Sequence, residues 1–211
     1  MNSKQTSEII KDIKKQLFLK GRVVTEGSGS PEELAYLSEV VTRYEARRVV
    51  EIGFNAGFSS AVFLETHPDV TVLSFDICAH SYVRPAKSYI DKKYPQRHTL
   101  IEGDSTETVP RFAKSNPTER FDLIFIDGGH AYEIAKQDIE NMKDLATPQA
   151  AVIMDDLTPW LRWGEGPSKA WREALAEGLV RQKELFQDGK AVQETIPPGK
   201  RAWALGEYIF N

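Results

Sequence analysis

The stretch that most constrains the fold of this 211-residue chain runs from Val49 to Leu64. It begins with a short apolar run that ends at Ile52, meets glycines at Gly53 and Gly57, and continues with apolar residues at helical spacing. This order predicts a strand, a tight turn and the start of a helix. Glycines at such a turn let the backbone approach a ligand closely. The stretch therefore predicts a cradle for a small ligand.

The residues around these glycines distinguish two kinds of ligand. The pattern is Gly-x-x-x-Gly after an acidic residue, Glu51, whereas the dinucleotide fingerprint is Gly-x-Gly-x-x-Gly after an apolar residue. A carboxylate at the end of the strand is well placed to accept hydrogen bonds from an ammonium group, but it would be poorly placed beside a pyrophosphate. The turn therefore favours a cofactor with an ammonium group over a dinucleotide.

In its acidic-x-Gly-x-x-x-Gly form, the turn resembles the first motif of the class I S-adenosylmethionine-dependent methyltransferases. The resemblance implies that S-adenosylmethionine is the cofactor, and that it is bound by residues of the turn and the helix start: Glu51, Gly53, Asn55, Gly57 and Ser59. The motif by itself leaves open a strand, turn and helix of some other α/β protein.

Apolar runs of strand length alternate with stretches of helical spacing along the chain. We predict strands at residues 49–52, 70–75, 99–101, 121–126, 150–154, 180–186 and 201–210. We predict helices at residues 7–19, 32–44, 58–64, 83–93, 106–114, 132–145 and 168–178. This alternation predicts a single-domain α/β protein of Rossmann-like architecture, with a mostly parallel seven-stranded sheet and helices on both faces. The class I methyltransferase resemblance implies that the last strand is antiparallel.

Composition and charge exclude several partners. Hydrophobic and charged contents of 41% and 27% are those of an ordinary globular protein. No apolar run approaches the about 18 residues that span a bilayer, and the N-terminus lacks the features of a signal peptide. A net charge of −4 gives no general attraction to nucleic acid. We therefore expect a cytoplasmic protein with neither membrane nor nucleic-acid partners.

We expect residues 1–30 to form a segment of their own before a methyltransferase domain at residues 31–211. Residues 7–19 carry apolar side chains at helical spacing among lysines, which predicts an amphipathic helix. That helix could pack on the core, cover the active site or support a homodimer. The loop from Gly21 to Ser30, rich in glycine and serine, is interpreted either as a lid over a ligand or as a plain connector.

Acidic residues follow the expected parallel strands. Asp76 follows the second strand, about 20 residues beyond the glycine turn, where an acidic side chain can hold the two hydroxyls of a ribose. Gly103, Asp104 and Ser105 follow the third strand, and the resemblance places this segment beside the adenine. Helix capping is the alternative role for Asp76 and Asp104.

The second half of the chain carries a more specific pattern. Asp127 ends the fourth expected strand, and Asp155 and Asp156 end the fifth, 28 residues later. Three carboxylates at neighbouring strand ends suit Mg²⁺, which prefers oxygen ligands and leaves positions for water and substrate. A cation there can lower the pKa of a substrate hydroxyl. His130 follows Asp127 closely enough to face the same site as a proton acceptor.

This pattern resembles the metal-dependent O-methyltransferases related to macrolide-sugar O-methyltransferases and cephalosporin-hydroxylase-like proteins, with the catechol O-methyltransferases as more distant relatives. The resemblance covers residues 32–156. It implies that Asp127, Asp155 and Asp156 bind Mg²⁺ or another divalent cation, that Asp127 also contacts the cofactor, and that His130 is the general base. The catechol enzymes have Asn at the position of Asp156 and usually a lysine as base, and this chain has neither.

Trp160 and Trp163 follow the acidic pair and could form an apolar wall over a flat or sugar-like substrate. Packing against the last expected helix is the alternative. The lone Cys78 cannot form an intramolecular disulfide, and we expect it to be a small buried side chain.

Together these features predict a Mg²⁺-dependent O-methyltransferase. It would move a methyl group from S-adenosylmethionine to a hydroxyl of a small acceptor such as a sugar, a phenol or another natural product. Two alternatives stay open, because a fold and a cofactor do not fix a reaction. One is another, hydroxylase-like chemistry on the same scaffold, and the other is a regulatory module that binds the cofactor without turnover.

Overall fold

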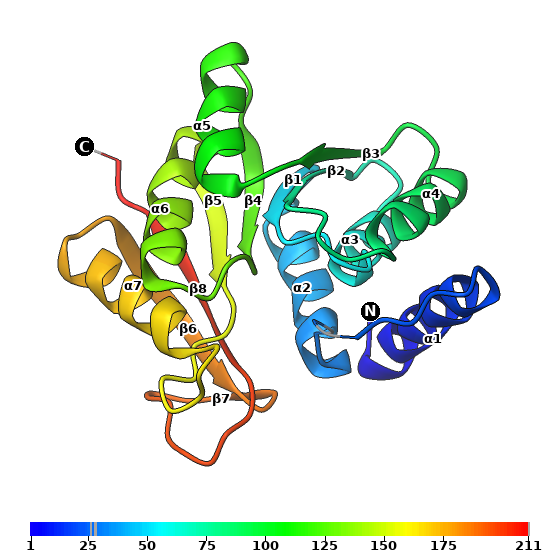
Figure 1. Ribbon diagram of the computed structural model, residues 1–211. Coiled ribbons are helices and arrows are strands. Elements are labelled where there is room, and N and C mark those ends of the chain that lie inside the picture. The colour runs from blue at the N-terminus through cyan, green and yellow to red at the C-terminus, as the bar shows by residue number, and fades with distance from the viewer. Residues whose placement is uncertain (26, 28, 211) are drawn as a thin grey trace. The chain divides into compact units, whose positions relative to one another are not determined.

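The structure, a computed structural model, describes residues 1–25, 27 and 29–210. The chain falls into two compact units, Met1–Asp104 and Ser105–Asn211 (Figure 1). Each unit combines helices with hydrogen-bonded strands, and each carries part of the predicted site.

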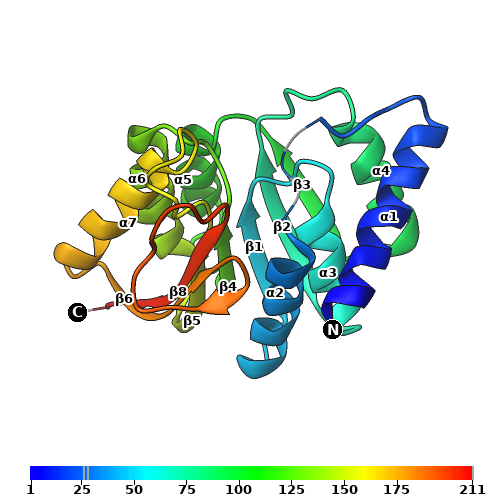
Figure 2. The same ribbon diagram turned by 90° about the horizontal axis from the view of Figure 1, so that it is seen from below.

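The first unit has a parallel sheet in the order β3-β2-β1 (Figures 1 and 2). Its elements are, in chain order, α1 (Ser3–Leu19), α2 (Pro31–Arg43), β1 (Arg48–Ile52), α3 (Phe58–Thr66), β2 (Thr71–Asp76), α4 (Val83–Lys93) and β3 (His98–Glu102). Parallel pairing brings the carboxyl ends of β1 and β2 together, with Ile52 opposite Phe75. The glycine turn therefore lies next to the end of β2.

The two N-terminal helices begin at capping boxes. The Ser30 hydroxyl oxygen accepts a hydrogen bond from the Glu33 backbone N–H, and the Ser30 backbone N–H donates to the Glu33 carboxylate. Pro31 occupies the first turn of α2. Asn2 and Gln5 form the same arrangement at the start of α1. These caps satisfy backbone N–H groups that a helix leaves unpaired at its start.

Helix α1 buries one face in the first unit. Its inward side chains include Ile9, Ile13 and Leu17, and it packs against α2, α3 and α4 (Figure 2). In contrast, Phe18 and Leu19 at its end are 71% and 70% exposed. The predicted amphipathic helix is confirmed, while the proposed boundary between residues 30 and 31 stays a prediction.

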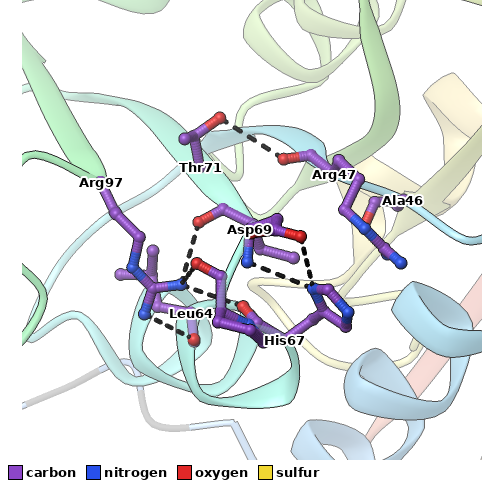
Figure 3. Close-up of polar contacts among 9 residues, drawn as sticks. Ala46, Arg47, Leu64, His67, Asp69, Thr71 and Arg97 are labelled. Carbon is purple, nitrogen blue, oxygen red and sulfur yellow. Dashed lines mark hydrogen bonds and ion pairs between the residues drawn. The ribbon is translucent and has the colours of Figure 1, made fainter.

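Arg97 fixes the connection between α3 and β2 (Figure 3). Its Nη2 donates to the carbonyl of Leu64 at 2.9 Å, and its Nη1 donates to the carbonyls of His67, Pro68 and Val70 at 2.9, 2.6 and 3.3 Å. Carbonyls at the end of a helix lack partners within the helix. The guanidinium group of Arg97, directly before β3, provides hydrogen-bond partners for these carbonyls. It thereby connects α3, β2 and β3.

The second unit has a mixed sheet in the order β4-β5-β8-β6-β7. Its elements are, in chain order, α5 (Ser105–Ser115), β4 (Phe121–Ile126), α6 (Tyr132–Met142), the short 3-10 helix η1 (Lys143–Leu145), β5 (Ala146–Met154), α7 (Glu165–Ala176), β6 (Val180–Gln187), β7 (Lys190–Ala191) and β8 (Ala202–Tyr208). Strands β4 and β5 are parallel, and β8 is antiparallel to both β5 and β6. Helix α6 packs between α5 and α7.

Strand β8 is buried on both faces between β5 and β6. Trp203 and Leu205 are each 1% exposed. Gly206 admits no side chain, because an added Cβ would lie 2.7 Å from Val180 and 2.9 Å from the carbonyl of Arg181. Close packing of this kind fixes the position of β8 beside the strand that leads to the acidic pair.

All the strands and helices expected from the sequence are present, and the predicted antiparallel last strand is confirmed. Several details differ. The sequence predicts seven strands, and the structure adds the two-residue β7, which is too short to leave a pattern. Strand β5 begins at Ala146 instead of Ala150, and the helix expected at 132–145 ends as η1. Among the described residues, no helix combines the length and the apolar character needed to cross a membrane.

Candidate active site

The glycine turn of the first unit depends on backbone conformations that glycine favours. The φ angles of Gly53, Asn55 and Gly57 are 96°, 49° and 75°. A Cβ at Gly57 would also lie 2.9 Å from the ring of Phe54. The N–H of Gly53 donates to the carbonyl of Phe75 at 2.8 Å, which extends the pairing of β1 and β2 into the turn. The turn is therefore set by its glycines and by β2.

Asp76 joins the end of β2 to this turn. One carboxylate oxygen accepts a hydrogen bond from the N–H of Asn55 at 2.7 Å, and the other accepts one from the N–H of Cys78 at 2.6 Å. Each carboxylate oxygen can accept a second hydrogen bond. The structure thus brings Asp76 next to the glycine turn, and its role at a ribose stays a prediction.

Cys78 is less buried than the small buried side chain expected from the sequence. It is partly buried, and its φ angle of 56° lies in the left-handed region. Burial, together with the negative charge of Asp76, raises the pKa of the thiol to about 12. The chain bends sharply after Asp76, which keeps Cys78 near the surface.

Glu51 is completely buried and surrounded by hydroxyl groups. Ser59 and Ser74 each donate to its carboxylate at 2.6 Å, and Ser60 donates a further hydrogen bond. Burial raises the pKa of Glu51, and the three hydroxyls only partly oppose that shift. Glu51 and Ser59 therefore hold the start of α3 against β1 and β2. Their contact with a cofactor stays a prediction.

His98 belongs to the same buried network, although the sequence alone assigns it no role. Its Nε2 lies 2.8 Å from Oγ of Ser74, and its ring centroid lies 4.9 Å from that of Phe54. Burial and the charge of Lys87 lower the pKa of His98 to about 3, so the ring is neutral. Since Ser74 donates its proton to Glu51, we assign the His98 proton to Nε2, which donates to Ser74. Only the pairing of β2 with β3 reveals this contact.

The glycine-serine loop contacts the turn through Gly27. The side-chain amide of Asn55 donates to the carbonyl of Gly27 at 3.1 Å. A Cβ at Gly27 would lie 1.9 Å from that amide nitrogen, so a larger residue would displace the Asn55 side chain, and the φ angle of 61° also favours glycine. Residues 26 and 28, which belong to the expected lid, lie outside the described residues. The choice between a lid and a connector stays open.

The segment after β3 contains the residues expected beside the adenine. Gly103 has a φ angle of 137° and donates its N–H to the carbonyl of Asp76 at 2.9 Å. Asp104 is exposed, and Ser105 begins α5 in the second unit. The structure thus places Gly103 next to Asp76, and the adenine contacts stay predictions.

The second unit brings the three expected metal ligands together. Asp127 follows β4, and Asp155 and Asp156 follow β5, whose last residue Met154 lies opposite Ile126. One carboxylate oxygen from each aspartate lies within 4.8 Å of the others. Three carboxylates so close together repel one another unless a cation is present. The donor set fits a divalent cation that prefers oxygen ligands.

The backbone of Asp156 is held in an unusual conformation. Its φ angle is 61°, a left-handed value that costs a non-glycine residue about 1–2 kcal/mol. Its N–H donates to the Asp155 side chain at 2.7 Å, and its carbonyl accepts from Thr158 at 2.9 Å. The next residue, Leu157, donates to the carbonyl of Ala202 in β8 at 2.7 Å. These bonds turn the Asp156 side chain back toward the cluster.

His130 reaches the same cluster from the loop after β4. Its Nε2 lies 3.1 Å from Oδ2 of Asp156, and its side chain is 51% exposed. The backbone of this loop rests on α7, because a Cβ at Gly166 would lie 2.2 Å from the His130 carbonyl and 2.7 Å from the Tyr132 nitrogen. The four residues selected from the sequence therefore lie together in the second unit. Their chemical roles stay predictions.

The two tryptophans after the acidic pair differ in their surroundings. Trp160 donates its indole N–H to the carbonyl of Gly199 at 2.8 Å, whereas Trp163 is 45% exposed. Gly164 lets this loop fold back, since a Cβ there would lie 2.4 Å from the Thr158 carbonyl. Trp160 is thus held by the connection between β7 and β8, and substrate contact by either tryptophan stays a prediction.

The sequence matches a family described as a methyltransferase domain over residues 50–157, just over half of the chain. It is 26% identical over 163 residues to the O-methyltransferase hkm8 of Aspergillus hancockii. That alignment covers 75% of this chain, and the chain spans 62% of the length of the Aspergillus protein.

The fold is similar to that of solved O-methyltransferases. The Bacillus cereus enzyme in complex with SAH has a TM-score of 0.74 and 17% identity, covering 95% of this chain and 90% of that chain. TomG of Streptomyces achromogenes, involved in tomaymycin synthesis and solved with SAM, has a TM-score of 0.72 and 17% identity, covering 95% and 89%. These similarities confirm the predicted class I fold.

Proposed function

Because this chain belongs to the methyltransferase domain family, we propose that it transfers a methyl group from S-adenosylmethionine to a hydroxyl group of a small molecule, with the help of a divalent cation such as Mg²⁺. The observation that carries the proposal is the cluster of Asp127, Asp155 and Asp156 with His130 beside it. An acidic cluster would serve no purpose in a module that only binds the cofactor, and it suits an oxygen nucleophile.

The three aspartates would hold the cation. When bound, the cation supplies a Lewis acid that lowers the pKa of an acceptor hydroxyl. His130 is half-exposed, so an acceptor can approach it from solvent, and its imidazole would take the hydroxyl proton. The Asp156 carboxylate, 3.1 Å away, would stabilise the positive charge that His130 then carries.

The glycine turn of the first unit would hold the cofactor. Gly53 and Gly57 leave room for its close approach, and Asp76 would accept hydrogen bonds from the ribose hydroxyls. Asn55, through its contact with Gly27, would link binding to the glycine-serine loop. The bound SAH and SAM of the Bacillus and Streptomyces enzymes support this choice of cofactor.

Methyl transfer needs no covalent enzyme intermediate in this proposal. The acceptor oxygen attacks the sulfonium methyl group, the carbon–sulfur bond breaks, and S-adenosylhomocysteine leaves with the electron pair on sulfur. The hydroxyl proton passes to His130. Positioning two bound substrates can supply about 7–11 kcal/mol of the rate enhancement.

The test combines calorimetry with a transfer assay. S-adenosylmethionine should bind to the purified protein in the absence of metal, because most of the residues predicted to bind it belong to the first unit and lie outside the acidic cluster. Methyl transfer to members of a panel of catechols and hydroxylated sugars, followed by mass spectrometry, should stop with EDTA and return with Mg²⁺. Absence of cofactor binding would refute the whole proposal. Transfer that persists in EDTA would refute the metal alone.

A homodimer is part of the same proposal. The exposed Phe18 and Leu19 at the end of α1 offer the apolar surface for it. Light scattering should give twice the monomer mass, and a Phe18→Glu variant should shift the protein toward the monomer. A monomeric wild-type protein at micromolar concentration would contradict this part.

A further inference from the structure

We propose that the second unit carries a separate binding site for a small phosphorylated molecule with a flat apolar part. The site is an open cavity of about 460 Å³, within the range of known ligand pockets. It is lined by residues from α5, η1 and the chain segments next to β4, β5 and β8. None of them belongs to the proposed active site, so this inference does not depend on the proposed function.

The cavity lies at the opposite end of the strands from the acidic cluster. Arg120 comes directly before β4 and Ala146 begins β5, whereas Asp127 and Asp155 follow the other ends of these strands. A strand of six residues is about 20 Å long. A ligand in the cavity therefore cannot take part in chemistry at the cluster.

Positive charge predominates in the lining. Lys114, Arg120 and Lys143 face a single carboxylate, Asp144, in a chain whose net charge is −4. Within the described part of the chain, no ion pair engages any of these three cations. They therefore remain available to a ligand from solution.

The guanidinium of Arg120 is already oriented. Its Nη1 donates to the carbonyls of Pro117 and Glu119 at 3.0 and 2.7 Å. These two bonds use one nitrogen of the group and hold its plane, while the remaining donors stay available. An oriented guanidinium loses less conformational freedom when it binds an oxyanion.

The rest of the lining is apolar and includes an aromatic ring. Phe210 is 42% exposed, and Lys143 Nζ lies 5.4 Å from the centre of its ring. An edge-to-face contact with Tyr208 holds the ring of Phe210. Tyr208 is itself fixed, because its hydroxyl donates a hydrogen bond to the carbonyl of Ile139. Two prolines complete this surface: Pro110 and Pro117. A flat apolar group can therefore lie beside the cations.

The charge and the size together select the ligand class. Three cations against one carboxylate suit a multiply charged phosphate better than a single carboxylate group. A volume of about 460 Å³ leaves room for an attached ring system. The chemistry is that of a nucleoside phosphate or a similarly phosphorylated aromatic molecule.

Calorimetry on the full chain tests the proposal. The probes are uridine diphosphate, adenosine diphosphate, inorganic pyrophosphate and uridine, in low salt. EDTA prevents phosphate from binding through a metal, and saturating S-adenosylhomocysteine blocks the proposed cofactor site. We expect both nucleoside diphosphates to bind, with weaker binding at higher salt. Uridine should bind at least about tenfold more weakly, because it lacks the charged group.

Variants locate the site. Arg120→Ala and Lys143→Ala should each weaken nucleoside diphosphate binding by about tenfold or more, and Phe210→Ala should weaken it relative to pyrophosphate binding. Lys190→Ala, an exposed lysine of β7 in the same unit, is the matched control and should change nothing. Thermal denaturation of each variant checks that it folds.

Two results would overturn the proposal. No binding of any phosphate probe would refute the site, as would equal binding by the wild type and the Arg120 and Lys143 variants. Pyrophosphate that binds as tightly as uridine diphosphate, together with no effect of Phe210→Ala, would refute the apolar part of the assignment. If S-adenosylhomocysteine fails to bind, that result contradicts the proposed function only. The comparison of phosphate probes and of variants at the second site stays valid.

Discussion

The Nε2 atom of His130 lies 3.1 Å from Oδ2 of Asp156, so the proposed base contacts one of the three proposed metal ligands directly. The two residues come from different strand ends, since His130 follows β4 and Asp156 follows β5. A single carboxylate can thus face a cation with one oxygen and the imidazole with the other. Because the two residues lie on different loops, each can be replaced by itself, and the contributions of the proposed base and of the proposed ligand can be measured one at a time.

Replacing His130 by Ala should lower turnover by about 100-fold to 10,000-fold, the usual contribution of a positioned general base. Calorimetric affinity for S-adenosylmethionine should stay unchanged, because His130 lies outside the glycine turn. His67→Ala, which removes an imidazole in the first unit, serves as the control. Unchanged turnover in His130→Ala would remove this residue as the base.

Replacing Asp155 by Asn should strongly weaken Mg²⁺ binding and activity, because the amide has no negative charge. Asp156→Asn should weaken both less, because the resemblance to the catechol O-methyltransferases, which have Asn at this position, implies that an amide can serve there. Calorimetric titration with Mg²⁺ measures both effects. Asp144→Asn removes an exposed carboxylate from the same unit, and it should leave the titration unchanged. If all three variants titrate like the wild type, the cation binds elsewhere.

Replacing Gly166 by Ala should reduce turnover through the position of His130. The added methyl group would lie 2.2 Å from the His130 carbonyl, so the loop must move. We expect a loss of stability of about 1–3 kcal/mol, typical of overpacking, and a larger fall in kcat than in Mg²⁺ affinity. Glu165→Ala, on the exposed side of the same helical turn, is the control. A Gly166→Ala enzyme with wild-type kcat would show that the loop position does not matter.

Acid should destabilise the first unit through His98. Its pKa is about 3 in the folded protein, against an ordinary value of 6.5, so the unfolded chain takes up a proton first. Stability is therefore full above pH 6.5 and falls as the pH drops toward 3, by up to about 1.4 kcal/mol per pH unit. The raised pKa of Glu51 acts in the opposite direction, because it favours the folded state at low pH.

The effect of His98 can be isolated by comparison with a His98→Gln variant. Urea denaturation at several pH values gives the free energy of unfolding of both proteins, and their difference cancels the contribution of Glu51 to a first approximation. The variant should lose less stability than the wild type between pH 6.5 and pH 4. Parallel curves for the two proteins would contradict the neutral buried state of His98.

Replacing Arg97 by Lys should destabilise the protein by about 1–3 kcal/mol. An ammonium group cannot reach four carbonyls that a planar guanidinium spans, so some of these carbonyls, three of which are partly buried, lose their partner. Arg84→Lys changes an exposed ion pair with Glu102, and it should cost less than about 1 kcal/mol. Equal losses in the two variants would argue against a special role for Arg97.

The sequence predicts most of the fold because strand and helix patterns alternate so regularly. It also selects Asp127, His130, Asp155 and Asp156 as one group, since neighbouring parallel strands end at the same edge. The sequence prediction misses the first turn of α1, because the residues before Ser7 show no apolar residues at helical spacing. The capping box of Asn2 and Gln5 would have indicated that the helix begins at Ser3.

The contacts of Glu51 could not be predicted in the same way. A strand pattern shows which residues are apolar, but it does not show which hydroxyls converge on a polar side chain inside the unit. Ser60 and Ser74 come from different elements and donate to Glu51, and His98 from a third element contacts Ser74; only the observed register brings this network together. The left-handed backbone of Asp156 is equally invisible in the sequence, because neighbouring hydrogen bonds impose it.

The bond between Leu157 and Ala202 has a consequence for biosynthesis. Strand β8 lies between β5 and β6, although it is translated after β6 and β7. Asp155 and Asp156 therefore emerge from the ribosome well before the strand that anchors the segment following them. A nascent chain cannot adopt the final geometry of the acidic cluster until translation has passed residue 208, which links the maturation of the site to the synthesis of the second unit.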